Sequence, residues 1–136
     1  MDETNKHLTQ VVAGVNVKYI NNMPYVLLGL KPRGEWEFPG GKVENNEEHY
    51  EALEREWIEE LGVMVRCDDE RFGHGRSGKF EVWFYEVDII QDEYQDGEPT
   101  SREHVDVKYF RLDECDGVEM NKVNKVILNK LINKYS

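Results

Sequence analysis

The predicted elements run strand, strand, loop, helix, strands, helix, and this order indicates an α/β fold with a mixed β-sheet. Two stretches carry most of this prediction. Residues 47–61 contain neither Gly nor Pro and are rich in Glu, Leu, Ala and Arg, a composition that favours a helix. Residues 80–87 alternate and place aromatic side chains on both faces, which is typical of a central strand covered on both sides. The 136 residues suit a single domain, residues 1–136.

The chain before this helix predicts a β-hairpin. Residues 10–17 are rich in valine and residues 25–30 form a second apolar run, so we expect the two runs to pair as strands. The loop at residues 31–34 reads Lys-Pro-Arg-Gly. It is either a plain turn or a basic loop near a substrate phosphate, with Lys31 the better candidate and Arg33 the weaker one.

The predicted helix has an apolar face that should meet the core. Its members recur at helical spacing and are Tyr50, Leu53, Trp57 and Leu61. We expect Asn45 or Asn46 to cap the start of this helix, because asparagine side chains satisfy free N–H groups there. Gly62 suits a left-handed stop after Leu61.

A second face of the same helix carries three carboxylates, Glu56, Glu59 and Glu60, which fall on one side at about 100° per residue. Such a face is often simply exposed to solvent. Alternatively, it binds a hard cation, since Mg²⁺ and Mn²⁺ prefer oxygen ligands and tolerate several carboxylates. The Gly-Gly turn just before the helix favours the metal site, because glycines let backbone carbonyls approach a ligand closely.

The second half of the chain predicts further strands and a final helix. Residues 71–79 contain three glycines and are expected to form a flexible hairpin end, and the acidic residues 88–101 a surface excursion. The expected strands are residues 63–67, 80–87 and 105–110. Residues 121–135 return to helical periodicity, with Val123, Ile127 and Leu131 on one face.

Charge and cysteine content limit the classes of partner. The net charge of −11 argues against a broad electrostatic grip on duplex nucleic acid, although metal ions can offset the local field for a small phosphate substrate. With no secretory signal, Cys67 and Cys115 are expected to be reduced thiols in a cytoplasmic protein. No apolar run is long enough to cross a membrane. Whether the protein is a monomer or a homodimer stays open.

Seven residues keep the spacing of a known motif: Gly41, Glu47, Arg55, Glu56, Glu59, Glu60 and Gly62. This pattern resembles the Nudix box of the Nudix hydrolase family. The preceding stretch, WEFPGGK at residues 36–42, is similar to the LEFPGGK of MutT-type members. The resemblance implies an α/β/α sandwich in which the box forms a loop, a helix and a loop. Trp57 departs from the usual aliphatic residue, and Lys31 stands where an arginine is common.

The resemblance also implies a site for Mg²⁺ or Mn²⁺, whose ligands are the carbonyl of Gly40 and the side chains of Glu56, Glu59, Glu60 and Glu103. Arg55 would pair with Glu47 and so aim the catalytic carboxylates, while Gly41 and Gly62 shape the backbone. Glu103 could equally be an exposed loop acid. The carboxylate that takes a proton from the attacking water stays open among Glu56, Glu59 and Glu103.

The same resemblance implies that four residues bind the substrate: Lys42, Phe38, Lys31 and Asn121. The lysines would contact phosphates. Phe38 would lie near the base pocket, or is an ordinary core phenylalanine. Asn121 would hydrogen-bond the base or, alternatively, cap the last helix, with Asn124 as the other register for the base contact.

The reaction that the resemblance implies is Mg²⁺-dependent hydrolysis of a P–O–P bond in a small nucleotide. The leading substrate is a nucleoside triphosphate, ordinary or oxidised (8-oxo-dGTP-like), converted to a monophosphate and pyrophosphate. ADP-ribose, dinucleoside polyphosphates and RNA 5′ ends are alternatives within the family. An alternative of another functional class is a module that binds a nucleotide without hydrolysing it, although the presence of all the box carboxylates argues against this alternative.

Overall fold

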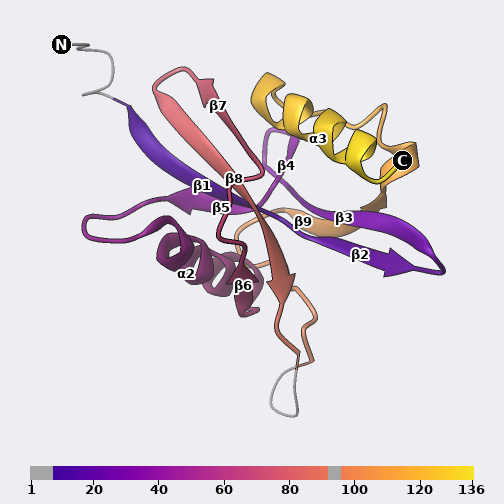
Figure 1. Cartoon of the computed structure of the whole chain (residues 1–136), viewed down its shortest axis with the longest axis horizontal. Helices are drawn as coiled ribbons and strands as arrows, with labels where there is room; N and C mark the ends of the chain where they lie inside the picture. Colours follow the sequence, from indigo (N-terminus) through magenta and orange to yellow (C-terminus); the bar gives the residue numbers. More distant parts are fainter. Residues whose placement is uncertain (1–7, 92–95) are drawn as a thin grey trace.

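The computed structural model describes residues 8–91 and 96–136, in which two β-sheets lie between helices α2 and α3 (Figure 1). The helices are α2 (His49–Leu61), α3 (Lys122–Lys134) and a short 3₁₀ helix, η1 (Leu112–Glu114). The strands are β1 (Thr9–Val15), β2 (Val17–Ile20), β3 (Met23–Leu30), β4 (Trp36–Glu37), β5 (Gly40–Lys42), β6 (Val65–Cys67), β7 (Gly73–Ser77), β8 (Phe80–Ile89) and β9 (Asp106–Arg111).

The predicted mixed sheet is present, and a second, antiparallel sheet accompanies it. In the mixed sheet the order is β5-β1-β8-β6, with β7 also paired to β8, and β1 runs parallel to β8. The antiparallel sheet has the order β2-β3-β4, with β9 also paired to β3. Strand β8 is therefore central, as its two apolar faces indicated.

The expected hairpin between residues 10–17 and 25–30 is only partly present, because most of residues 10–17 pair elsewhere. The chain changes sheets at Asn16, so that β1 joins the mixed sheet and only β2 pairs with β3. Asn16 is 5% exposed, donates to the carbonyl of Val87 at 2.9 Å and accepts from the Tyr109 hydroxyl at 2.8 Å. These bonds to β8 and β9 fix the point where the chain crosses between the sheets, because a buried amide must be hydrogen-bonded.

Two hydrophobic clusters, one under each helix, confirm the α/β/α sandwich. The cluster under α3 contains Ala13, Val15, Val26, Leu28, Phe38, Phe84, Leu112, Cys115, Ile127, Leu128 and Leu131. The cluster under α2 contains Val12, Leu27, Ala52, Leu53, Trp57, Leu61, Val63, Val65 and Val87. Consecutive residues of β1 and β3 enter opposite clusters, as the alternation of a strand requires.

Helix α2 begins later than predicted, and its cap is not an asparagine. Glu48 is the N-cap and forms a capping box with Glu51, whereas Asn46 adopts a left-handed φ of 67° in the preceding loop. Tyr50 is 52% exposed and does not reach the core, because it lies in the first turn of the helix. Ala52, fully buried, packs there instead.

Within the glycine-rich segment at residues 71–79, Gly73–Ser77 form strand β7, which pairs with β8 in the expected hairpin but is a regular strand and not a flexible end. A Cβ on Gly73 would lie 2.4 Å from Cδ1 of Ile127, and one on Gly75 would lie 2.7 Å from Cγ1 of Val123. The glycines thus let α3 pack directly on β7. Both cysteines are free thiols, as predicted.

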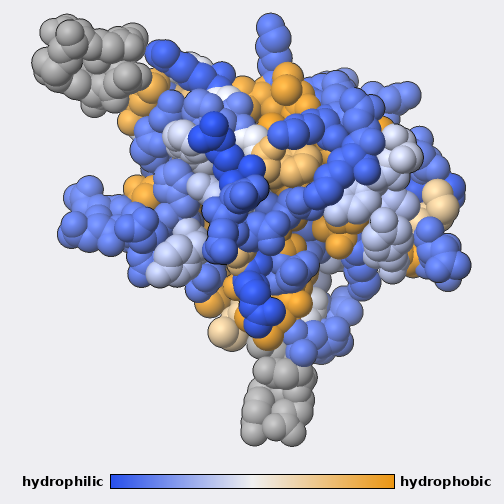
Figure 2. Space-filling view, in the orientation of Figure 1, coloured by the Kyte–Doolittle hydropathy of each residue, from blue (hydrophilic) through white to orange (hydrophobic). Residues whose placement is uncertain are grey.

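The viewed face of the molecule is mostly hydrophilic, with small apolar areas between the polar side chains (Figure 2). Within the described residues, no helix is both long and apolar enough to cross a membrane.

Candidate active site

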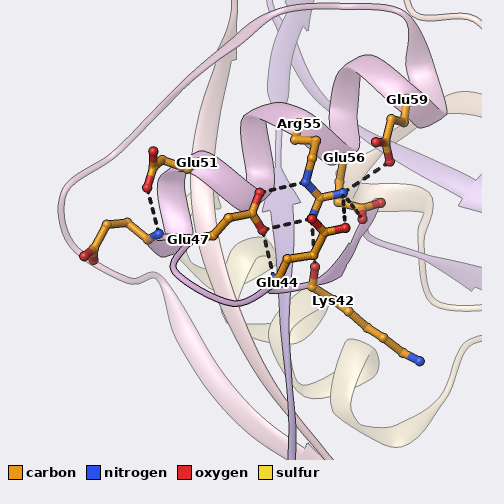
Figure 3. Close-up of polar contacts among 8 residues, drawn as sticks. Lys42, Glu44, Glu47, Glu51, Arg55, Glu56 and Glu59 are labelled. Atoms are coloured by element: carbon orange, nitrogen blue, oxygen red, sulfur yellow. Dashed lines mark hydrogen bonds and ion pairs between the residues drawn. The ribbon is translucent and has the colours of Figure 1, made fainter.

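Arg55 joins the loop before α2 to the carboxylates on the helix (Figure 3). Its Nε donates to Oε2 of Glu47 at 2.7 Å and its Nη2 to Oε1 of Glu47 at 3.0 Å, a bidentate pair that fulfils the prediction. Nη2 also donates to the carbonyl of Lys42 at 3.0 Å. Nη1 reaches Glu56 at 2.8 Å and Glu59 at 3.3 Å. One guanidinium therefore orients two of the predicted metal ligands.

The Arg55–Glu47 pair stays ionised over a wide pH range. The hydrogen bonds from Arg55, together with one from the backbone N–H of Glu44, lower the pKa of Glu47 to about 2. In the same way the Glu47 carboxylate raises the pKa of Arg55 above its ordinary value. Because both groups keep their charge, the loop from Lys42 to Glu47 remains tied to α2 under ordinary conditions.

Glycines occupy the positions where the backbone must pass close to other groups. A Cβ on Gly41 would lie 2.4 Å from Cδ of Glu56, so the carboxylate can rest against β5 only because this side chain is absent. A Cβ on Gly40 would lie 1.9 Å from the carbonyl oxygen of Val12 in β1. Gly62 ends α2 with a φ of 70°, the left-handed stop that its position predicted.

Glu60 is the buried member of the carboxylate group. Its side chain is 5% exposed, and its Oε2 has no hydrogen-bond partner among the described residues. Burial, followed by the nearby charges of Glu56, Glu37 and Glu103, raises the pKa of Glu60 above its ordinary value. A buried carboxylate crowded by like charges is unfavourable unless a cation accompanies it. The donor set therefore fits a divalent metal.

Three of the predicted metal ligands come together in space. One carboxylate oxygen from each of Glu56, Glu60 and Glu103 lies within 4.8 Å of the others, although Glu103 is more than 40 residues away along the chain. Glu59 lies at the edge of this group, with a side chain that is 49% exposed and bonded to Arg55. Together these acids form a cluster that could hold a metal ion.

Two residues of the site were not predicted from the sequence, Glu37 and His104. Nε2 of His104 lies 2.9 Å from Oε2 of Glu37 and 3.7 Å from Oε1 of Glu60. The imidazole is 4% exposed and rests on Gly29 of β3, where a Cβ would be 2.6 Å from the ring. In the sequence Glu37 precedes Phe38 and His104 follows Glu103, both of which were predicted. Glu37 and His104 come together only because β3 pairs with both β4 and β9.

A cavity of about 170 Å³ is lined by Glu37, the neighbour of Glu60, and by most of the predicted substrate-binding residues. Its lining includes Lys31, Glu37, Phe38, Gly40, Asn121 and Asn124, together with Ser77, Phe80 and Val82, which sequence reasoning missed. Lys42 is not in the lining, and Figure 3 shows its amino group directed away from the Arg55 network. A larger hollow of about 460 Å³, lined by residues that include His49, Cys67 and Tyr85, contains no predicted site residue within the described chain.

Asn121 and Asn124 form a hydrogen-bonded pair at the wall of this cavity. Oδ1 of Asn121 accepts from the backbone N–H of Asn124 at 2.9 Å, which confirms Asn121 as the N-cap of α3. The same oxygen accepts from Nδ2 of Asn124 at 2.8 Å. Oδ1 of Asn124 in turn accepts from the backbone N–H of Phe38 at 3.4 Å. Phe38 itself is 2% exposed and packs edge-on against Phe84, so its ring belongs to the core.

Comparison with known proteins assigns the family. Residues 13–131 match the model of the NUDIX domain. The chain belongs to the Nudix family. Among solved structures, MutT described for Aliivibrio salmonicida and Vibrio cholerae is similar to this Nudix chain, with 25% identity, a TM-score of 0.77, and 93% of this chain and 98% of the other covered.

Curated relatives of this Nudix chain include two proteins named 8-oxo-dGTP diphosphatase. The one from Haemophilus influenzae is 28% identical over 136 aligned positions, which cover 95% of each chain. The one from Proteus vulgaris is 43% identical over 67 positions, covering 48% of this chain. The chain spans 57% of the Proteus protein's length.

Proposed function

We propose that this Nudix chain is a pyrophosphohydrolase that converts an oxidised purine nucleoside triphosphate, such as 8-oxo-dGTP, to the monophosphate and pyrophosphate. The observation that carries the proposal is the link through Glu37, which lines the cavity with the two asparagines and also lies within 4.8 Å of Glu60, a member of the carboxylate cluster with Glu56 and Glu103, when ligand atoms are compared. The names of the Haemophilus and Proteus relatives support the choice of nucleotide.

A Mg²⁺ or Mn²⁺ ion would be held by Glu56, Glu60 and Glu103, with Glu59 and the Gly40 carbonyl as further ligands. When bound, such an ion would neutralise phosphate charge and lower the pKa of a water molecule. Arg55 keeps Glu56 and Glu59 in place through its Nη1 contacts. Glu56, Glu59 and Glu103 are the carboxylates whose oxygens could accept the proton of the attacking water.

The lining of the cavity is suited to a nucleobase and not only to a sugar-phosphate. It combines apolar walls from Phe80 and Val82 with amide groups from Asn121 and Asn124, as base recognition requires. Lys31 lines this cavity, with its Nζ 3.9 Å from Oε1 of Glu37, and is the lysine best placed for a phosphate. Arg33 is exposed and outside the lining.

A hydrolysis panel tests the substrate. With Mg²⁺, we expect kcat/KM to be highest for an oxidised purine nucleoside triphosphate, by about 10-fold or more over the ordinary triphosphates, because the asparagine pair offers hydrogen bonds to an altered base edge. Equal amounts of ordinary and 8-oxo triphosphates, ADP-ribose, diadenosine polyphosphate and triphosphorylated RNA should be compared by chromatography of the products. Preference for one of the last three compounds would replace the proposed substrate with a different one.

Replacing Asn121 with aspartate separates base recognition from helix capping. Aspartate caps a helix about as well as asparagine, so Asn121→Asp should leave Tm nearly unchanged. It exchanges an amide donor for a second acceptor at the cavity wall, so the order of kcat/KM among the nucleotides should change. If Tm and the substrate order both stay the same, Asn121 is a cap and takes no part in base recognition.

Three features of the proposed enzyme remain predictions. They are a cytoplasmic location, a small-molecule nucleotide substrate with no stable binding of duplex nucleic acid or membranes, and an oligomeric state that is either monomer or homodimer. The extent of the domain, residues 1–136, is a prediction of the same kind.

A further inference from the structure

The C-terminal end of α2 carries unusual negative charge. Its last turn reads Ile58-Glu59-Glu60-Leu61, so two carboxylates stand where a basic side chain would favour the helix dipole. The last carbonyl groups of a helix also lack partners within the helix. This end of α2 therefore needs donors, and a positive charge, from another part of the chain.

The segment Thr100–His104 supplies both. The backbone N–H of Thr100 donates to the carbonyl of Leu61 at 2.8 Å, and the N–H of Arg102 donates to the carbonyl of Glu60 at 3.1 Å. Nη1 of Arg102 donates to the carbonyl of Ile58 at 3.4 Å. The guanidinium lies over Gly62, where a Cβ would be only 2.8 Å from Nη2. Arg102 thus caps α2 from about 40 residues further along the chain.

The far end of this segment is also anchored. The backbone N–H of Val105 donates to the carbonyl of Leu30 at the end of β3, at 2.8 Å. The Ser101 hydroxyl donates to the carbonyl of His104 at 2.6 Å, and His104 is bonded to Glu37. Glu103 therefore lies between Arg102, attached to α2, and His104, attached to the antiparallel sheet.

Glu103 needs this anchoring because its neighbours repel it. One oxygen of the Glu103 carboxylate lies within 4.8 Å of a carboxylate oxygen of Glu56 and of one of Glu60. Like charges at this separation repel, and an exposed loop would move away from them if it were free. The Arg102 side chain, through its bond to the carbonyl of Ile58, adds to the backbone bond between residues 102 and 60 and so holds the loop against that repulsion.

We propose that Arg102 is a positioning residue, which docks the loop on the end of α2 and so holds Glu103 at the carboxylate cluster. This inference rests on the role of Glu103 in the proposed function. Arg102 is not among the residues that line the cavity, and it acts through its neighbour Glu103. Replacing Arg102 should therefore lower kcat only while Glu103 is present.

A double-mutant cycle tests this dependence on the full-length protein with the best nucleotide from the panel. We expect Arg102→Ala to lower kcat about 10-fold, the lower end of the usual loss when a group that orients a metal ligand is removed, with KM changed less than about 2-fold, and Glu103→Gln to lower kcat more strongly. In the Glu103→Gln background, Arg102→Ala should lower kcat less than 2-fold further. Arg102→Lys, which can still donate to a helix carbonyl, should recover part of the loss. Arg66→Ala, an exposed arginine of β6, is the control and should stay within 2-fold of the wild type.

The outcomes separate this inference from the proposed function. If Glu103→Gln lowers kcat but Arg102→Ala lowers it 10-fold in both backgrounds, Arg102 only supports the fold and the inference is overturned alone. A normal kcat in Arg102→Ala overturns it as well. If Glu103→Gln has wild-type kcat, or if no nucleotide is hydrolysed, the proposed function fails and the inference fails with it. Should Arg102→Ala not fold, the cycle uses Arg102→Lys, whose smaller loss of kcat should likewise disappear in the Glu103→Gln background.

Discussion

Glu60→Gln should lower kcat with the best nucleotide by about 10³-fold, equivalent to about 4 kcal/mol of transition-state stabilisation. Glu60 is the most buried carboxylate of the cluster and the one whose Oε2 has no protein partner among the described residues. Glutamine keeps the shape of the side chain but removes the negative charge that a metal ion needs. Steady-state kinetics in Mg²⁺ measure the effect, and activity within 10-fold of the wild type would exclude Glu60 as a ligand.

The same variant should be folded, and in chelator it should be more stable than the wild type. The pKa of Glu60 is raised in the folded protein, so folding favours its protonated form, and ionisation reduces stability as the pH rises above about 4.5. Glutamine cannot ionise and escapes this loss, so the difference in Tm should grow from acid to neutral pH. Glu54→Gln, on another face of α2 beside the 460 Å³ hollow, is the matched control and should change neither kcat nor this pH dependence.

Arg55→Gln should lower kcat by about 10- to 100-fold, the usual loss when a group that orients metal ligands is removed. The substitution breaks the bidentate pair with Glu47 and the contacts with Glu56 and Glu59. It leaves these acids to repel one another, so Tm should fall as well. Kinetics at increasing Mg²⁺ measure the effect, and part of the lost activity should return at high concentration because the cation replaces the missing positive charge.

Arg66→Gln provides the comparison for this prediction, because Arg66 is an exposed arginine on β6 that lines the 460 Å³ hollow, where none of the cluster carboxylates is found. It should leave kcat and the dependence on Mg²⁺ unchanged. If Arg55→Gln behaves like Arg66→Gln, the guanidinium neither orients the carboxylates nor holds the loop.

The parts of the site that the sequence predicted are those that depend on local chemistry. Helical spacing placed Glu56, Glu59 and Glu60 on one face, and the conformational demands on glycine placed Gly40, Gly41 and Gly62. The helix, the central strand and the α/β class follow from composition and periodicity over long windows. The box resemblance added the Arg55–Glu47 pair and the distant Glu103.

The parts that it missed depend on contacts between distant segments. The change of sheet at Asn16 requires acceptors and donors from β8 and β9, which no local pattern of residues indicates. The glycines of β7 were interpreted as flexibility because their partner, α3, lies about 50 residues further on. Glu37 and His104 meet only after β3 has paired with both β4 and β9.

The most direct test of the account is product analysis after hydrolysis of 8-oxo-dGTP in ¹⁸O-labelled water with Mg²⁺. A metal-dependent pyrophosphohydrolase should give 8-oxo-dGMP and pyrophosphate in equal amounts, with one ¹⁸O atom incorporated per turnover, and should lose the reaction in chelator. Release of inorganic phosphate with the nucleoside diphosphate, or a rate that does not change when the divalent cation is removed, would contradict this expectation.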